Sequence, residues 1–130
     1  MQHKECAHQK AFVQWFRFQY RNHANLLIHI PNGQNVGPIV GKRLKSMGLI
    51  AGAPDIFIAI PNSLYHGLFI EMKAEKGRVS KEQKAMHIEL KAAGYEVIVA
   101  YGALEAIEST KNYLKLDALP THSKARQSKR

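Results

Sequence analysis

The chain has 130 residues, of which 19 are Lys or Arg and 10 are Asp or Glu, so that its formal net charge is +9. This length is typical of one domain that buries a core without disulfides, and the single cysteine excludes a disulfide within the chain. Since no apolar stretch approaches the about 20 residues that span a membrane, and the first residues do not resemble a signal peptide, we expect a cytoplasmic protein.

The first half of the chain contains the patterns of three elements: a helix over residues 4–22, a strand over 26–30 and a short basic helix over 38–47. Apolar residues near helical spacing, such as Phe12 and Phe16, indicate the first helix. A Pro-Asn-Gly turn ends the strand, and Gly48 is suited to close the second helix.

The second half predicts two strands, a helix, a strand and a final helix, over residues 55–60, 67–73, 80–93, 95–101 and 103–116. The first two strands are joined by a short turn and are expected to pair antiparallel. Ser80 is suited to cap the helix that follows, with Gln83 in a capping box and Gly94 beyond its last turn. A strand so close behind that helix indicates a crossover to a parallel neighbour. We therefore expect an α/β domain, a small mixed β-sheet flanked by helices, over residues 1–116, followed by a basic, flexible tail over 117–130.

Two carboxylates and a lysine gather on neighbouring predicted strands. Asp55 opens one strand, and Glu71 and Lys73 lie two residues apart on the next, so that they face the same side of the sheet. Hydrolysis of a phosphodiester needs an activated water and a neutralised phosphate, and a divalent cation held by carboxylates provides both. A nearby lysine would orient or deprotonate the water, or stabilise the transition state. One interpretation of these residues is the active site of a metal-dependent nuclease. The alternative is that Glu71 and Lys73 lie on the solvated face of a strand and that Asp55 belongs to an ordinary turn.

Three segments, taken together, resemble a known family of nucleases: Gly52-Ala53-Pro54-Asp55, Glu71-Met72-Lys73 and residues 77–83. Their order and spacing are similar to those of the VRR-NUC (virus-type replication-repair nuclease) family within the PD-(D/E)XK nuclease superfamily. The residues 29–33 and 94–97 also look like that family, so that the resemblance covers nearly the whole domain. It implies a restriction-endonuclease-like core and a DNA endonuclease that depends on Mg²⁺ or Mn²⁺.

The resemblance also implies a role for each residue of the central motif. Asp55 and Glu71 would hold the metal through their carboxylates and Met72 through its backbone carbonyl, while Lys73 would be the catalytic lysine. Small stand-alone members look viral or phage-like and resemble Holliday-junction resolvases, which implies branched DNA as the substrate and a bacterial or phage-infected cell as the setting. Because symmetric cutting of a four-way junction needs two active sites, we expect a homodimer.

Two further residues have competing interpretations. The resemblance implies that Gln83 contacts the phosphate or an active-site water, but its amide is also suited to close the capping box with Ser80, and we expect these two roles to compete. Glu5 is the only acid in the first predicted helix and would complete the metal site. Alternatively, Glu5 is an exposed carboxylate that is favourable to the helix dipole.

Half of the remaining lysines and arginines in the predicted domain form two clusters that we expect to contact the DNA backbone: Lys42, Arg43 and Lys45, and Lys76, Arg78, Lys81 and Lys84. A positive surplus of this size indicates an acidic polymer as a partner, most often nucleic acid. It also allows an alternative, a basic nucleic-acid-binding protein without catalysis. The histidines give little indication of function, since His29 and His87 are predicted to lie on the surface of a strand and a helix.

Overall fold

The computed structural model describes residues 3–32 and 36–116, and the predicted tail lies outside them. The helices and strands follow the expected order: α1 (His3–Gln19), β1 (Leu27–His29), α2 (Pro38–Ser46), β2 (Ile56–Ile58), β3 (Leu68–Lys73), α3 (Lys81–Ala92), β4 (Glu96–Tyr101) and α4 (Ala103–Lys115). The 3-10 helix η1 (Arg21–Leu26) was not predicted. Within the described residues the strands form one sheet in the order β1-β2-β3-β4. The pairs β1–β2 and β2–β3 are antiparallel and β3–β4 is parallel, so the predicted mixed sheet and crossover are confirmed.

The largest error in the predicted boundaries concerns the first helix. It ends at Gln19 rather than at residue 22, and η1 separates it from β1. Residues 21–25 include two asparagines, whose side chains favour turns over helix interiors. The capping box is confirmed, because Gln83 donates its backbone N–H to Ser80 Oγ at 3.1 Å and accepts the Ser80 N–H at Oε1 at 2.8 Å.

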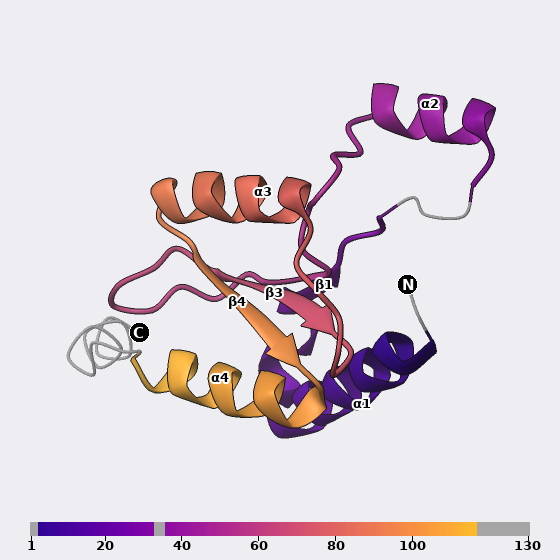
Figure 1. Ribbon diagram of the computed structural model, residues 1–130. Helices are drawn as coiled ribbons and strands as arrows, with labels where there is room; N and C mark the ends of the chain where they lie inside the picture. The colour runs from indigo at the N-terminus through magenta and orange to yellow at the C-terminus, as the bar shows by residue number, and fades with distance from the viewer. Residues whose placement is uncertain (1–2, 33–35, 117–130) are drawn as a thin grey trace.

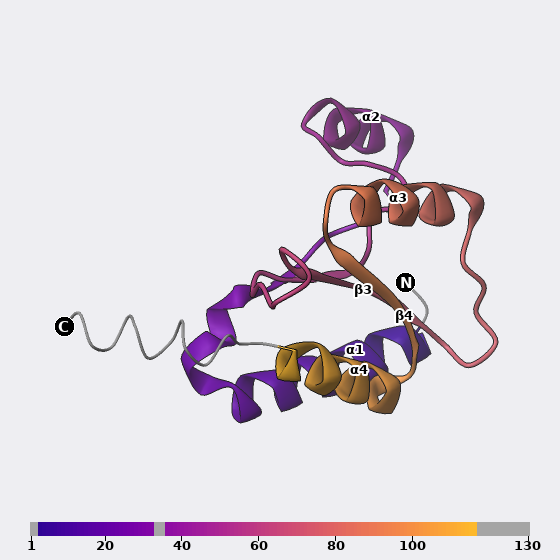
Figure 2. The same cartoon turned by 90° about the vertical axis from the view of Figure 1, so that its left-hand side faces the viewer.

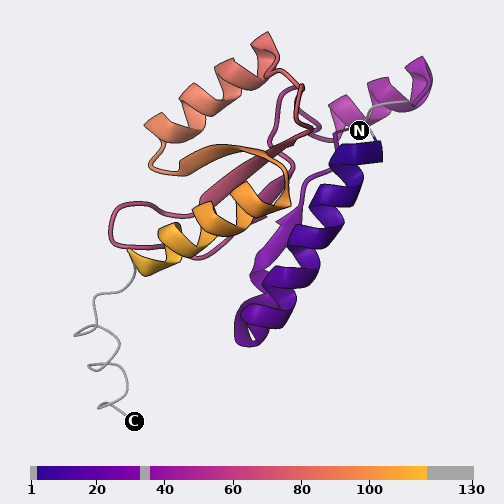
Figure 3. The same ribbon diagram turned by 60° about the horizontal axis from the view of Figure 1, so that its bottom comes forward.

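Helices cover both faces of the sheet. Figures 1 and 3 show α1 and α4 side by side on one face, and α3 on the other. The core between the sheet and the α1–α4 layer contains side chains that are at most 1% exposed: Phe12, Phe16, Ile56, Ile58, Leu68, Ile70, Met72, Ala100 and Ala106. Because successive residues of a strand face opposite sides, Phe69, Glu71 and Lys73 of β3 face α3. The face of the sheet on which Glu71 and Lys73 were predicted to lie together is therefore covered by a helix.

The helix α2 stands apart from these layers, as Figure 2 shows. None of its residues, all of which the structure describes, is buried, and Ile39 is 84% exposed. Gly48 has a φ of 110° and follows the helix as expected. No helix in the described part of the chain is long and apolar enough to cross a membrane. The arm that α2 forms therefore contributes surface rather than core.

Candidate active site

The two predicted metal-binding carboxylates are neighbours where β2 and β3 meet. Ile56 pairs with Ile70 in the antiparallel register, so the next residues outward, Asp55 and Glu71, lie opposite each other on the face that α3 covers. Asp55 is 5% exposed and Glu71 is 2% exposed. Like charges that face each other across a sheet are destabilising, and burial of a charge adds a desolvation cost. This pair is therefore a feature that stability alone does not explain.

Hydrogen bonds from both sides hold Asp55 in place. Its Oδ2 accepts the backbone N–H of Met72 at 2.7 Å. Its own backbone N–H donates to the carbonyl of Ile70 at 3.1 Å, and its carbonyl accepts the N–H of Ile30 at 2.8 Å. The Met72 side chain is buried in the core. The backbone of Met72 thus orients Asp55 through its N–H, and metal binding through its carbonyl stays a prediction.

Two side chains of α3 face the carboxylate of Glu71. Gln83 Nε2 donates to Oε2 at 3.0 Å, and His87 Nε2 lies 3.5 Å from Oε1. The amide of Gln83 makes two contacts at once, because its oxygen closes the capping box while its nitrogen reaches Glu71. A contact of Gln83 with phosphate or water stays a prediction. His87 is also not the surface residue that we expected, since it is only 8% exposed. Its spacing of four residues from Gln83 is the signal that places both on one helix face.

The pKa of Glu71 is raised from 4.5 to about 9, and burial is the largest cause of this shift. The neighbouring Asp55 carboxyl raises this pKa further, as does Glu5, while Lys73 lowers it. Burial also lowers the pKa of His87, and the neighbouring lysines act in the same direction. At neutral pH Glu71 therefore keeps its proton unless a cation replaces it.

The donor set fits a hard divalent cation. Among the described residues, Oε1 of Glu71 is buried and has no hydrogen-bond partner, although it lies beside a second carboxylate. Mg²⁺ is commonly held by one or two carboxylates and completes its octahedron with waters. In the described part of the chain no three His, Cys, Asp or Glu residues form a metal-binding group, so Asp55 and Glu71 would hold the ion as a pair. Glu5 lines an adjoining hollow of about 660 Å³ with residues 74–77, within electrostatic reach of Glu71.

The structure separates the two predicted DNA-contacting clusters. The residues that we call the rim cluster are exposed and follow β3 or lie in the first turns of α3: Lys76, Arg78, Lys81 and Lys84. They therefore lie close in sequence to Lys73 and Gln83. The residues that we call the arm cluster are exposed on α2: Lys42, Arg43 and Lys45. Figure 1 shows this helix on the side of α3 and away from the sheet.

The bend before Asp55 packs directly against the first turn of α3. Gly52 has a φ of +87°, and a Cβ at this position would collide with the carbonyl of Glu82 and lie 2.9 Å from the nitrogen of Gln83. We expect Gly52→Ala to lower the free energy of unfolding by about 1–3 kcal/mol through strain, which thermal unfolding measures. Gly37→Ala is the control without a steric contact, because a Cβ there meets nothing within 4 Å, and it should cost less than Gly52→Ala even though Gly37 is the N-cap of the exposed helix α2. Equal stability of both variants would contradict this close approach.

A buried acidic pair and a lysine on central strands of a mixed sheet, covered by helices on both faces, define a nuclease-like α/β core. The model of the VRR-NUC domain family matches residues 3–104, and the chain belongs to this family. A solved structure described as a VRR_NUC domain protein is similar to the chain, with a TM-score of 0.76 and 29% sequence identity over 87% of this chain and 89% of that chain. No curated protein matches the chain. The resemblance seen in the sequence is confirmed, and membership of the family supports a nuclease function.

Proposed function

We propose that the protein is a DNA endonuclease that depends on Mg²⁺ or Mn²⁺ and hydrolyses phosphodiester bonds at the Asp55–Glu71 pair. The observation that carries this proposal is the burial of these two carboxylates opposite each other, with Glu71 Oε1 unpartnered among the described residues. A buried pair of acidic side chains that persists against its cost indicates a cation or a reaction that needs it. A bound divalent cation would supply a Lewis acid at the phosphate and a water of lowered pKa.

The other residues of the site have distinct proposed roles around this pair. The Met72 N–H orients Asp55 and the Gln83 amide orients Glu71, so that both carboxylates are held before substrate binds. Lys73 would hold the attacking water or an equatorial phosphate oxygen. The rim cluster would position the DNA backbone, since contacts to phosphates fix the register of the substrate without reading bases. Glu5 would approach the ion from α1.

We also propose that the enzyme prefers branched DNA, such as a four-way junction, and acts as a homodimer. The described residues offer only the α/β core and the α2 arm for DNA recognition, which favours recognition of shape over base sequence. Symmetric incision of a four-way junction requires two active sites, and a two-fold dimer supplies them. The arm cluster on α2 would then contact a DNA arm that the rim cluster does not reach.

The deciding experiment compares a mobile four-way junction, a flap and a plain duplex at equal concentration, with Mg²⁺, with Mn²⁺ and with EDTA. We expect cleavage with either ion, fastest on the junction, and no cleavage in EDTA, although salt-sensitive DNA binding persists there. If Mn²⁺ leaves every DNA intact, the protein is instead a non-catalytic nucleic-acid-binding protein. Equal cleavage rates on the three substrates would reject the proposed preference for branched DNA but would support the proposed nuclease activity.

A further inference from the structure

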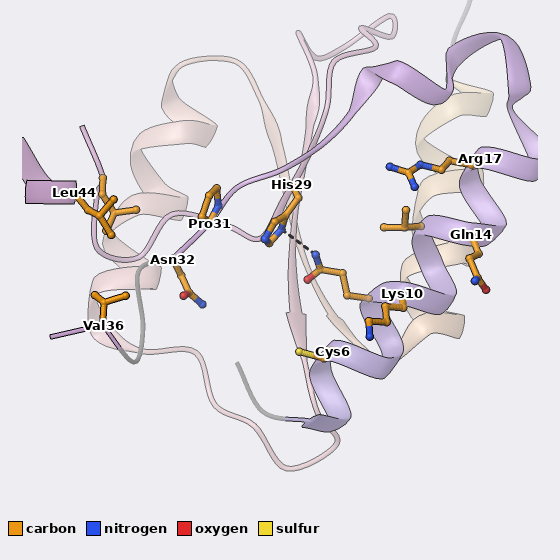
Figure 4. A pocket seen from close by; sticks show the side chains of 12 residues that line it. Cys6, Lys10, Gln14, Arg17, His29, Pro31, Asn32, Val36 and Leu44 are labelled. Atoms are coloured by element: carbon orange, nitrogen blue, oxygen red, sulfur yellow. Dashed lines mark hydrogen bonds between the residues drawn. The ribbon is translucent and has the colours of Figure 1, made fainter. Parts of the chain in front are cut away.

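A groove of about 740 Å³ separates α1 from the segment that contains α2. Its volume lies within the range of about 300–1,000 Å³ that is typical of ligand pockets. Figure 4 shows its two walls: Cys6, Lys10 and Arg17 lie along α1, and Val36 and Leu44 lie across from them. The α1 wall therefore carries the positive charge, and the other wall is mostly apolar, with Asn32 as its polar residue.

The groove belongs to the longest stretch of the chain without an acidic residue. No Asp or Glu occurs between Glu5 and Asp55, and every residue that lines the groove comes from this stretch. In the part of the chain that the structure describes, neither Lys10 nor Arg17 takes part in an ion pair. The positive charge at the groove is thus uncompensated and is complementary to a polyanion. A second copy of this chain also has a net charge of +9, so it is less complementary to the groove than a polyanion is.

The inner end of the groove contacts the residue that supplies one of the site carboxylates. His29 lines the groove, and its Nδ1 lies 3.1 Å from the backbone carbonyl oxygen of Asp55 and 2.9 Å from Gln9 Nε2. The side chain of the same Asp55 is bonded to the N–H of Met72 at the acidic pair. A polymer lying in the groove would therefore pass beside the backbone of Asp55, whose side chain belongs to the acidic pair.

We propose that this groove holds an unpaired DNA strand next to the phosphodiester that is cut, an inference that rests on the proposed nuclease function. An unpaired strand matches both walls, because cations bind its phosphates while apolar side chains contact its exposed bases. A plain duplex keeps its bases stacked inside and leaves the apolar wall without a partner. Branched and frayed DNA contains unpaired nucleotides, so the groove selects such substrates, with little preference for base sequence.

The single cysteine of the chain reports directly on this groove, because Cys6 lines it. The rate of alkylation of Cys6 is measured in the Glu71→Gln protein, in EDTA, with a saturating oligothymidine strand or an equal length of duplex. We expect the single strand to slow alkylation by about fivefold or more and the duplex to slow it much less, since only exposed bases fill the apolar wall. The proposal is overturned if the rate of Cys6 alkylation does not change although fluorescence anisotropy shows that the single strand is bound. Equal protection of Cys6 by the duplex would overturn it as well.

Arg17→Ala and Arg21→Ala form a matched pair, because they remove the same charge one turn apart. Arg17 lines the groove, whereas the guanidinium of Arg21 lies 5.0 Å from the centroid of the Phe18 ring, outside it. We expect Arg17→Ala to weaken single-strand binding and to reduce the salt slope by about 0.7, the value for one phosphate contact, while Arg21→Ala changes neither. Equal effects of the two variants would show general charge attraction and reject the groove.

Neither readout requires cleavage, so the groove and the proposed function are tested separately. Cleavage by wild-type protein without protection of Cys6 rejects the groove and keeps the nuclease. Protection of Cys6 without cleavage of any DNA rejects the nuclease and leaves a single-strand binding site. If alkylation slows with rising protein concentration in the absence of DNA, a second copy occupies the groove and the proposal is wrong.

Discussion

Glu71→Gln is expected to abolish DNA cleavage and, at pH 8, to raise the thermal stability of the metal-free protein. The substitution keeps the size of the side chain and removes the proton uptake on folding that burial and Asp55 impose on Glu71 at this pH. It also removes one of the two carboxylates proposed to hold the ion, so we expect turnover to fall by at least about 10³-fold, the scale of lost electrostatic stabilisation. A loss of function coupled to a gain of stability is the mark of a residue retained for chemistry.

The expected pH dependence follows from the raised pKa of Glu71. The unfolded chain releases this proton near pH 4.5, whereas the folded protein keeps it up to about pH 9. The stabilisation by the bound proton is therefore complete below pH 4.5 and is lost progressively as the pH rises toward 9. The unfolding midpoint of the variant should exceed that of the wild type by an amount that grows from pH 5 to pH 9. Each 1 kcal/mol corresponds to roughly 4 °C for a chain of this size.

Two controls complete this test. Glu89→Gln makes the same change at an exposed position of α3 and should alter neither cleavage nor the pH dependence of the unfolding midpoint. Mg²⁺ should stabilise the wild type, more strongly at higher pH, and should have little effect on Glu71→Gln, since the ion must displace the proton. A Glu71→Gln protein that melts below the wild type at pH 8, or that still cuts DNA, would contradict the proposed role.

The acidic pair could be predicted from the sequence because its geometry follows from local rules. Strand alternation places Glu71 and Lys73 on one face, and a short turn between two strands predicts the antiparallel pairing that brings Asp55 opposite Glu71. Capping rules likewise located the start of α3, since they depend on residues within one helical turn. For these elements the determining contacts are close in sequence, and prediction and structure agree.

The features that the sequence did not predict depend on contacts between distant segments. His87 is buried only because α3 packs its face against Glu71, and no pattern around residue 87 contains that information. Similarly, the pattern over 38–47 predicts a helix but does not say that it lies away from the sheet and forms one wall of a groove. The contact of Gln83 with Glu71 was missed because an amide has two ends, and tertiary structure decides where the second one lies.

Arg78→Ala and Lys73→Met are expected to separate binding from chemistry. Arg78 is exposed in the rim cluster, so its loss should weaken DNA binding about equally for all sequences and leave the single-turnover rate nearly unchanged. Lys73 is half-buried, follows Glu71 on the same face of β3 and is close enough to lower the pKa of that carboxyl. The contrast between these two cations therefore distinguishes a residue that positions the backbone from one that acts on the reacting atoms.

Lys73→Met should lower the single-turnover rate by about 10²–10⁴-fold, the usual contribution of a proton-transfer or charge-stabilising group, with little change in affinity. Methionine retains the length and apolar stem of lysine, which packs beside Gly77, so the fold should persist. Rates are measured with enzyme in excess over labelled junction DNA, and affinities by anisotropy in EDTA. If Lys73→Met instead behaves like Arg78→Ala, with weaker binding and an unchanged rate, then Lys73 binds a phosphate before the reaction and the activation of water belongs to the ion alone.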